Sequence, residues 1–340
     1  MNPSLADLLS CRSEILHTTR RLHFTKRIIR FNDEKYVLYR FPDRETARIF
    51  ARVIHDATQA GAALQNIAAR PENAWQDLRH GRWLAFHYEA GEEIRGKTAA
   101  PAIFSALGKT LAILHRQSSQ TPRALLHGPT LDIDEEYAAL ASAVTAEQRQ
   151  WLEESRRRLD DPGDYRLTHG DLYMKNIIVT PSGKTLLIDY ELFAYAIPGV
   201  ELAMLLLRHV CRAGSQRRPL LDAYLAHCDE ETRRQWGIHW KDYLLAAALR
   251  MAAQRARRRR IVGRRLSTLE RIAAIPMPQS LRARIAEQIV TQTKTIRSAE
   301  KAGRQYREIA CRLLVLIDTA GIDDPDILIG QCFKPARQRL

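Results

Sequence analysis

The stretch from Thr168 to Glu191 has the pattern of a β-hairpin, although the sequence on both sides of it has helical periodicity. Two apolar, β-branched runs, Ile177–Thr180 and Thr185–Ile188, flank the turn residues Pro-Ser-Gly-Lys. If Thr180 at the end of the first run pairs with Thr185 at the start of the second, Asn176 lies opposite Asp189. Asn176 is the polar residue just before the first run. Directly opposed side chains have Cβ atoms about 4.5–5.5 Å apart. The pattern therefore predicts an amide and a carboxylate side by side at the open end of the hairpin.

This pair has the chemistry of a site for a hard cation. Mg²⁺ binds few protein oxygens and keeps positions for water and phosphate, so Asn176 and Asp189 would suffice as its protein ligands. Asp171 precedes Asn176 by five residues, on the loop that enters the first strand. A carboxylate at that place can orient a substrate hydroxyl and accept its proton.

The order of these residues, H-G-D-x4-N followed by I-D-x-E, resembles the aminoglycoside phosphotransferase and choline kinase family, which has a protein-kinase-like fold. The resemblance implies an ATP-dependent kinase of small molecules with Asp171 as catalytic base. It implies that Asn176 and Asp189 hold Mg²⁺ and that His169 supports the loop. No role follows for Glu191.

Two further segments extend the resemblance. Leu107–Arg116 is similar to the first helix of the family's large lobe, which typically ends in a leucine–histidine pair. Glu201–Ala203, E-L-A, stands where family members often have D-L-A. The glutamate departs from that pattern, which puts any role of Glu201 in doubt. The similarity can be followed over residues 10–210, and the helical remainder resembles no specific family.

The nucleotide site is less clear in the sequence. Arg40 occupies the strand position of the cation that grips the phosphates, and Lys35, at the start of the same strand, is the less favoured alternative. Glu45 is the candidate partner of that cation or a first-turn carboxylate that favours the helix dipole. The backbone of His87 and Tyr88 either reads the adenine edge or belongs to an ordinary edge strand. Lys175 either neutralises the transferring phosphoryl group or is a solvated loop lysine.

The fold class predicted is α+β with two lobes. Residues 1–89 form a nucleotide-binding lobe, a small antiparallel sheet with one helix, and residues 90–340 form a mostly helical lobe with the catalytic loop and the acceptor site. The expected strands lie near 14–18, 27–31, 35–41, 74–78 and 82–88, and the expected helices at 44–61, 101–117, 138–159, 201–213, 218–227, 231–258, 279–296 and 299–320.

The chain carries a formal charge of +14, with seven arginines between Arg255 and Arg265. That charge favours an anionic acceptor, and the cluster is either a solvated helix face or a contact for glycolipid, nucleic acid or an anionic membrane surface. A non-catalytic nucleotide-binding scaffold is the third alternative. Only eleven residues separate Asp189 from Glu201, too few for the peptide-docking segment of protein kinases, so a small hydroxyl acceptor is favoured.

The five cysteines lie far apart and lack zinc-site spacing, which predicts reduced thiols. No apolar run has the length of a signal peptide or of a membrane span, and a cytoplasmic protein is expected. The sequence does not specify the acceptor molecule, the choice between ATP and GTP, or the oligomeric state.

Overall fold

The computed structural model describes residues 5–333 except 11–12, 22–23, 42, 69–82, 95–98, 119–133, 143, 161–164, 191–192, 209–213, 274–278 and 320–321. The chain divides into two compact units. The first comprises residues 1–129 and 162–238, and the second comprises residues 130–161 and 239–340. We describe each unit by itself.

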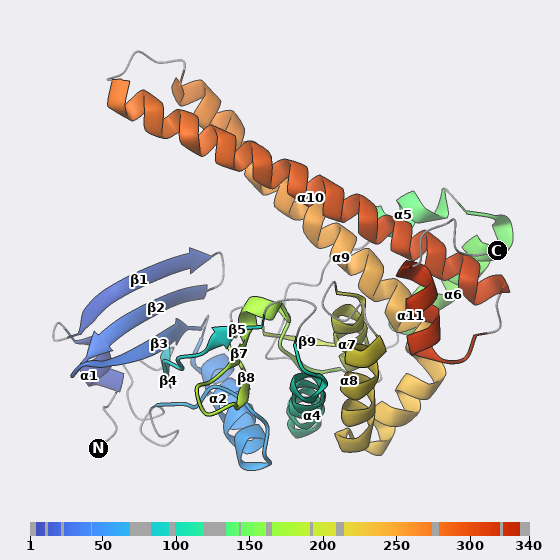
Figure 1. Ribbon diagram of the computed structural model, residues 1–340, viewed down its shortest axis with the longest axis horizontal. Coiled ribbons are helices and arrows are strands. Elements are labelled where there is room, and N and C mark those ends of the chain that lie inside the picture. The colour runs from blue at the N-terminus through green and yellow to red at the C-terminus, as the bar shows by residue number, and fades with distance from the viewer. Residues whose placement is uncertain are drawn as a thin grey trace. The chain divides into compact units, whose positions relative to one another are not determined.

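The first unit begins with a four-stranded antiparallel sheet in the order β1-β2-β3-β4 (Figure 1). A two-residue turn joins β2 to β3, and its residues Asn32 and Asp33 have φ angles of 48° and 61°. Asparagine and aspartate tolerate this left-handed conformation, which matches the twist of a tight hairpin. The strands are β1 (Glu14–Arg21), β2 (Phe24–Phe31), β3 (Glu34–Arg40) and β4 (Trp83–His87).

Strand β3 is buried on both faces of this sheet. Tyr36 and Leu38 point to one face, where they form a buried cluster with Leu8 of α1 (Leu5–Leu9). The intervening Val37 and Tyr39 point to the opposite face because side chains alternate along a strand. The alternation assigns each residue of β3 to one of two different environments.

The second face of the sheet packs on a cluster of aromatic rings. Tyr39 and Phe86 meet edge to face with centroids 5.5 Å apart, and Phe50 of α2 (Arg44–Gln59) lies 5.6 Å from Tyr190. Tyr190 contacts His169 as well, at 5.5 Å. Such ring pairs contribute about 0.5–1.5 kcal/mol each beyond their buried area. The cluster thus joins the sheet to the segment expected to carry the chemistry.

Helix α2 begins where the sequence predicts. The side chain of Asp43 accepts a hydrogen bond of 2.7 Å from the backbone N–H of Thr46, which satisfies one of the free donors at the helix start.

The rest of the first unit consists of helices and short strands. Gly108 on one helix lies against a second helix so closely that an added Cβ would be 2.2 Å from the carbonyl oxygen of Leu220. Only glycine permits this approach of the two backbones. The elements are β5 (Glu92–Glu93), α4 (Pro101–Gln117), β6 (Arg166–Thr168), η3 (Met174–Asn176), β7 (Ile177–Val179), β8 (Thr185–Leu187), β9 (Ala194–Ala196), α7 (Pro198–Leu207) and α8 (Gly214–His227).

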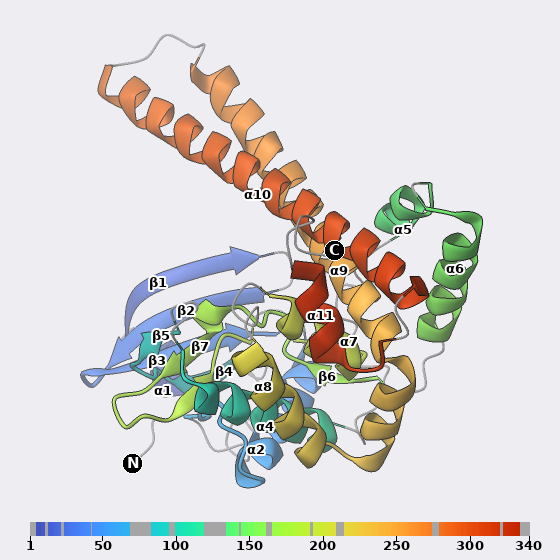
Figure 2. The ribbon, with the colours of Figure 1, turned by 45° about the vertical axis from the view of Figure 1, so that its right-hand side comes forward.

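The second unit is helical in its described residues. Two long antiparallel helices lie side by side in it, as both ribbon views show (Figures 1 and 2), and Arg259 of one forms an ion pair of 3.3 Å with Glu300 of the other. The elements are α5 (Asp134–Ala141), α6 (Ala146–Asp160), α9 (Glu230–Ala273), which starts in the first unit, α10 (Gln279–Thr319) and α11 (Pro325–Phe333).

The predicted α+β class, with an antiparallel sheet first and helices afterwards, is confirmed. Four of the predicted helices have the wrong bounds. The expected helix 138–159 is split into α5 and α6, the expected helices 279–296 and 299–320 are one continuous helix, and α9 continues past residue 258 to Ala273. The expected strand 74–78 lies outside the described residues. The lobe boundary after residue 89 falls inside the first unit and stays a prediction.

Two smaller predictions concern cysteines and membranes. The three described cysteines, Cys228, Cys311 and Cys332, are free thiols. In the described part of the chain no helix has both the length and the apolar character needed to cross a bilayer.

Candidate active site

The loop after β6 holds the predicted base. Gly170 takes a φ of 75°, which turns the chain sharply before Asp171. The N–H of Tyr173 then donates to the carbonyl of Asp171 at 2.7 Å, and the N–H of Asn176 donates to the carbonyl of Tyr173 at 2.8 Å. These bonds curl the loop so that residues five apart in sequence come together.

Asp171 and Asn176 are in direct contact. The Asn176 side-chain N–H₂ donates to the Asp171 backbone carbonyl at 2.7 Å and to its carboxylate Oδ2 at 3.2 Å. Both residues are buried, with exposed fractions of 8% and 2%. With its two donors committed, the amide of Asn176 has its oxygen left as an acceptor.

The hairpin register differs from the prediction by one residue. Val179 pairs with Thr185 and Ile177 with Leu187, so Asn176 faces Ile188, whose N–H donates to the Asn176 carbonyl at 2.9 Å. The prediction that Asn176 lies directly opposite Asp189 was wrong. The loop has three residues instead of four, because Gly183 adopts a φ of 79° and allows the turn to close one residue earlier.

Asp189 follows the hairpin in a conformation that is uncommon for a residue with a side chain. Its φ is 69°, which ends the strand and directs the carboxylate out of the ladder. Lys26 Nζ lies 3.0 Å from Asp189 Oδ1, and the Tyr39 hydroxyl donates to the same oxygen at 3.4 Å. The carboxylate thus lies against the second face of the sheet.

His169 is a neutral structural support. Its Nε2 lies 2.9 Å from the carbonyl of Ile188 and must donate there, so Nδ1 accepts the N–H of Asp171 at 3.3 Å. Complete burial lowers the pKa of His169, and the nearby carboxylates of Glu201 and Asp171 oppose that shift only in part. His169 thereby connects the base to the strand that precedes Asp189.

Glu201 holds the same loop through three hydrogen bonds. Its Oε1 accepts the N–H of Gly170 at 2.7 Å, and its Oε2 accepts the N–H of His169 and the Nε2–H of His115, both at 3.0 Å. Burial by itself would raise the pKa of Glu201, but the hydrogen bond and charge of His115 outweigh it and the pKa is lowered. The other ring nitrogen of His115 lies 2.8 Å from the Tyr224 hydroxyl.

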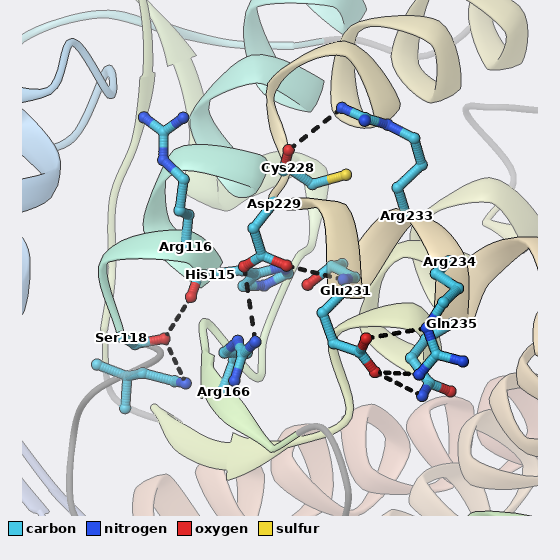
Figure 3. A network of polar contacts seen from close by, with 12 residues as sticks. His115, Arg116, Ser118, Arg166, Cys228, Asp229, Glu231, Arg233, Arg234 and Gln235 are labelled. Carbon is cyan, nitrogen blue, oxygen red and sulfur yellow. Dashed lines mark hydrogen bonds and ion pairs between the residues drawn. The ribbon is translucent and has the colours of Figure 1, made fainter.

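Strand β6, which leads into the loop, is fastened at its start. The Ser118 hydroxyl donates to the His115 carbonyl at 2.8 Å and accepts the N–H of Leu167 at 2.9 Å. Arg166 forms an ion pair of 3.6 Å with Asp229, as Figure 3 shows beside the Ser118 contacts. Strand β6 and the start of the loop are therefore held in place by these polar contacts, as a preorganised catalytic group requires.

The structure does not bring Arg40 to this site. Arg40 is exposed and lies on the same face of β3 as Tyr36 and Leu38, against α1, whereas Asp189 approaches the face of Tyr39. Lys26 pairs with Tyr39 across the strands and shares its face. Glu45 is exposed and lies 3.9 Å from Arg48 of its own helix, which agrees with the first-turn alternative.

Most backbone hydrogen-bonding groups of His87 and Tyr88 already have partners within the protein. The His87 N–H donates to the Asn66 carbonyl and its carbonyl accepts the Gln65 side-chain amide, while the Tyr88 N–H donates to the Lys35 carbonyl. Of the backbone groups expected to bind adenine, only the Tyr88 carbonyl and those of the following residues are left to do so. Lys175 is exposed on η3 beside the loop.

Sequence reasoning missed Lys26 and underrated Glu201. Lys26 gave no signal other than its strand pairing with residue 39. His115 and Glu201 gave a stronger one, since each stands in a segment that resembles the family. Glu191 lies outside the described residues, and among those described no three His, Cys, Asp or Glu side chains form a metal cluster.

Comparison with known proteins decides the family. The sequence model of the phosphotransferase enzyme family matches residues 20–237, well over half of the chain. The chain belongs to this family. The matched residues include the loop, the hairpin and Glu201. The protein-kinase-like α+β fold that the resemblance implied is thus the fold of this phosphotransferase.

Solved structures with a similar arrangement are distant in sequence, and no curated protein matches the chain. An aminoglycoside phosphotransferase from Alicyclobacillus acidocaldarius has 14% identity and a TM-score of 0.47, with 90% of this chain and 95% of that chain covered. A choline kinase from Streptococcus pneumoniae has 15% identity and a TM-score of 0.45, with 86% and 96% covered. A spectinomycin phosphotransferase in complex with ADP and spectinomycin has 12% identity and a TM-score of 0.48, with 96% and 93% covered.

Proposed function

We propose that this phosphotransferase moves the γ-phosphoryl group of ATP to a hydroxyl of a small molecule, in the cytoplasm. The family supports the reaction class. The observation that carries the proposal is the contact of Asn176 with Asp171, because it fixes a buried carboxylate and leaves an amide oxygen beside it.

Asp171 is the proposed base. Its Oδ2 accepts from Asn176 and its backbone N–H is held by His169, so the carboxylate has one orientation in which to receive the acceptor hydroxyl. The hydroxyl oxygen attacks the γ-phosphorus, the bond to ADP breaks, and the hydroxyl proton passes to Asp171 and then to solvent. A base held in place in this way need not reorganise during the reaction.

Asn176 and Asp189 fit the magnesium site that the family implies. The Asn176 amide oxygen and the Asp189 carboxylate are the hard oxygen ligands that Mg²⁺ prefers. Asp189 directly follows Ile188, which faces Asn176, so the two residues lie at the same end of the hairpin. When bound, Mg²⁺ would neutralise charge on the phosphates.

We assign to Lys26 the phosphate-gripping role expected of Arg40. The Lys26 ammonium lies 3.0 Å from Asp189, so it could bind phosphate oxygens near the residues that would hold Mg²⁺. Lys175 is exposed beside the loop, and in this proposal it neutralises the transferring phosphoryl group. Adenine would be read by the Tyr88 carbonyl and residues 89–91.

Production of ADP in the presence of ATP, Mg²⁺ and a library of hydroxyl compounds tests the proposal. Asp171→Asn keeps the shape of the side chain and removes its basicity, so turnover should fall at least about a hundredfold with an unchanged melting temperature. Asp222→Asn is the matched control, because Asp222 is an exposed carboxylate on α8 paired with Arg218. Equal turnover of Asp171→Asn and the control would exclude Asp171 as the base.

The arginine cluster supports a second candidate, an anionic partner such as glycolipid or nucleic acid. Six of its seven arginines are exposed on α9. Binding by such a face depends on counterion release, so affinity should fall steeply as salt increases. Absence of binding to anionic vesicles and to nucleic acid at low salt would leave the cluster as a solvated helix face.

A further inference from the structure

A buried arginine lies beside the catalytic loop. Arg208 directly follows α7, and its backbone N–H bonds to the Leu205 carbonyl. Only 5% of its surface is exposed, and the helix that precedes it is apolar apart from Glu201. A guanidinium stays protonated at any physiological pH, so burial leaves a full charge in a poorly solvated place.

Within the part of the chain that the structure describes, this charge has no carboxylate partner. Arg208 Nε is buried and lacks a hydrogen-bond acceptor. Two arginines of the second unit, both more exposed, contrast with it. Arg158 binds Asp242 through two bonds of 3.0 and 2.9 Å, and Arg307 binds Glu136 through bonds of 2.6 and 2.8 Å. Buried guanidinium groups need such pairing, so Arg208 calls for an anion that the described residues do not supply.

The contact that Arg208 does make points to the reaction centre. Its guanidinium carbon lies 3.6 Å from the centroid of the Tyr173 ring, which orients the planar group by stacking. Tyr173 is two residues beyond Asp171 and bonds to its carbonyl at 2.7 Å. Arg208 therefore packs against the loop that carries Asp171, and a ligand held by the free edge of its guanidinium would lie beside that loop.

We propose that Arg208 binds an oxyanion, phosphate or carboxylate, carried by the acceptor molecule. The fork of guanidinium N–H donors matches two oxygens of either group, and the pairing would compensate the buried charge only when acceptor is bound. The acceptor is then an alcohol with an anionic substituent, such as a phosphorylated sugar or a hydroxy acid. This inference rests on the proposed function, because it assigns the ligand to the acceptor side of that reaction.

Thermal unfolding of the full chain tests the anion site without catalysis. Inorganic phosphate or acetate, compared with chloride at equal ionic strength, should raise the melting temperature of the wild type. Arg208→Met should abolish that rise, while its melting temperature without added anion stays equal to or above that of the wild type, because an uncompensated charge has been removed. Comparison of phosphate with acetate distinguishes the two oxyanions.

Arg158→Met is the matched control. It removes the two hydrogen bonds of Arg158 to the buried carboxylate of Asp242, which keeps only the contact with His239 at 3.3 Å, so its melting temperature should fall while the response to phosphate persists. A large loss of stability in Arg208→Met without anion, a persistent response to phosphate in that variant, or no response in the wild type would each overturn the proposal.

Acceptors that differ only in their anionic group test whether the anion site acts on the acceptor. With glycerol, glycerol 3-phosphate and glycerate as acceptors, the wild type should prefer one of the anionic compounds in kcat/KM by about tenfold or more. Arg208→Met should bring that ratio near one, and Arg208→Lys should lie between, because lysine lacks the fork. A rise in KM for ATP with an unchanged ratio would instead place Arg208 at the nucleotide and overturn the assignment.

Failure of the proposed function gives a different result. If no acceptor yields ADP and Asp171→Asn matches the wild type, the kinase reaction fails. The phosphate-dependent stabilisation and its loss in Arg208→Met are measured separately, and their persistence would retain the anion site.

Discussion

Replacement of Glu201 by glutamine should damage the protein more than the loss of one charge suggests. The carboxylate accepts three hydrogen bonds in a fully buried place, from His115, His169 and Gly170. Glutamine keeps one oxygen. If that oxygen takes the two bonds of Oε2, the amide N–H₂ meets the N–H of Gly170, and two donors face each other.

The expected loss of stability follows from these bonds. One buried donor left unsatisfied costs about 1–3 kcal/mol, and the two remaining bonds lose their charge-assisted strength, about 1 kcal/mol. The smaller desolvation cost of an amide offsets a part, so we expect a net loss of about 2–3 kcal/mol. Because domains of this size shift by about 2–4 °C per kcal/mol, the melting temperature should fall by about 5–10 °C.

Denaturant unfolding and steady-state kinetics measure the two consequences. The kcat of Glu201→Gln should fall about ten- to a hundredfold, since the loop that carries Asp171 loses its anchor. Glu201→Asp, which restores the residue common in the family, is the control and should retain most of both quantities. An unfolding free energy of Glu201→Gln within about 0.5 kcal/mol of the wild type would refute the reasoning.

The same contacts predict a pH dependence. Because the pKa of Glu201 is lowered in the folded state, its stabilising contribution is complete above the ordinary glutamate pKa of about 4.3 and is lost as pH falls below it. Glu201→Gln should lack that part of the acid transition. Identical acid transitions for wild type and variant would show that Glu201 keeps an ordinary pKa.

Three further predictions concern other residues. Lys26→Met should raise the KM for ATP about tenfold or more. Lys109→Met, at an exposed lysine of α4, is the control and should leave that KM unchanged. Equal KM values for the two variants would exclude Lys26 from the nucleotide site. Gly183→Ala should cost about 1 kcal/mol, because its φ is 79° although nothing lies within 4 Å, whereas Gly263→Ala in a regular helix should add about 0.5–1 kcal/mol; equal signs would contradict this account. His169 is buried and its pKa is lowered, so the unfolded chain takes up a proton below about pH 6.5 that the folded chain refuses, and stability should decline there; His169→Gln should flatten that decline in urea titrations, and an unchanged slope would count against it.

The chemistry of the hairpin was readable from the sequence, but its register was not. Pro-Ser-Gly-Lys serves as a four-residue turn or, with Gly183 in the left-handed region, as part of a three-residue loop. Both alternatives keep the apolar runs paired. Since a shift of one residue changes which side chains face each other, the partner of Asn176 was decided by the conformation of a single glycine.

The face of β3 on which Arg40 lies could not be predicted for a different reason. Alternating polar and apolar residues reveal the buried face of a strand only when the other face is solvated. On β3 both Leu38 and Tyr39 are buried, so the pattern could not show which face meets Asp189. The pairing of Lys26 with Tyr39 becomes informative only once the sheet is formed.

Contacts across long separations were the hardest to predict. His115 and Glu201 lie 86 residues apart, and no local pattern joins them. The sequence placed each in a segment that resembles the family, yet their hydrogen bond emerges from the packing of three helices. The long helix pair of the second unit was likewise underestimated, because polar residues between 296 and 299 were read as a break.

Gly108 has a consequence for activity that its chemistry alone would not suggest. The absent side chain lets α4 touch α8, and these helices carry His115 and Tyr224, the two residues behind Glu201. A methyl group there would push α4 and α8 apart and displace His115 and Tyr224, which support Glu201 and the loop. A selection for inactive variants should therefore recover position 108, which bears no functional group at all, alongside Asp171 and Asp189.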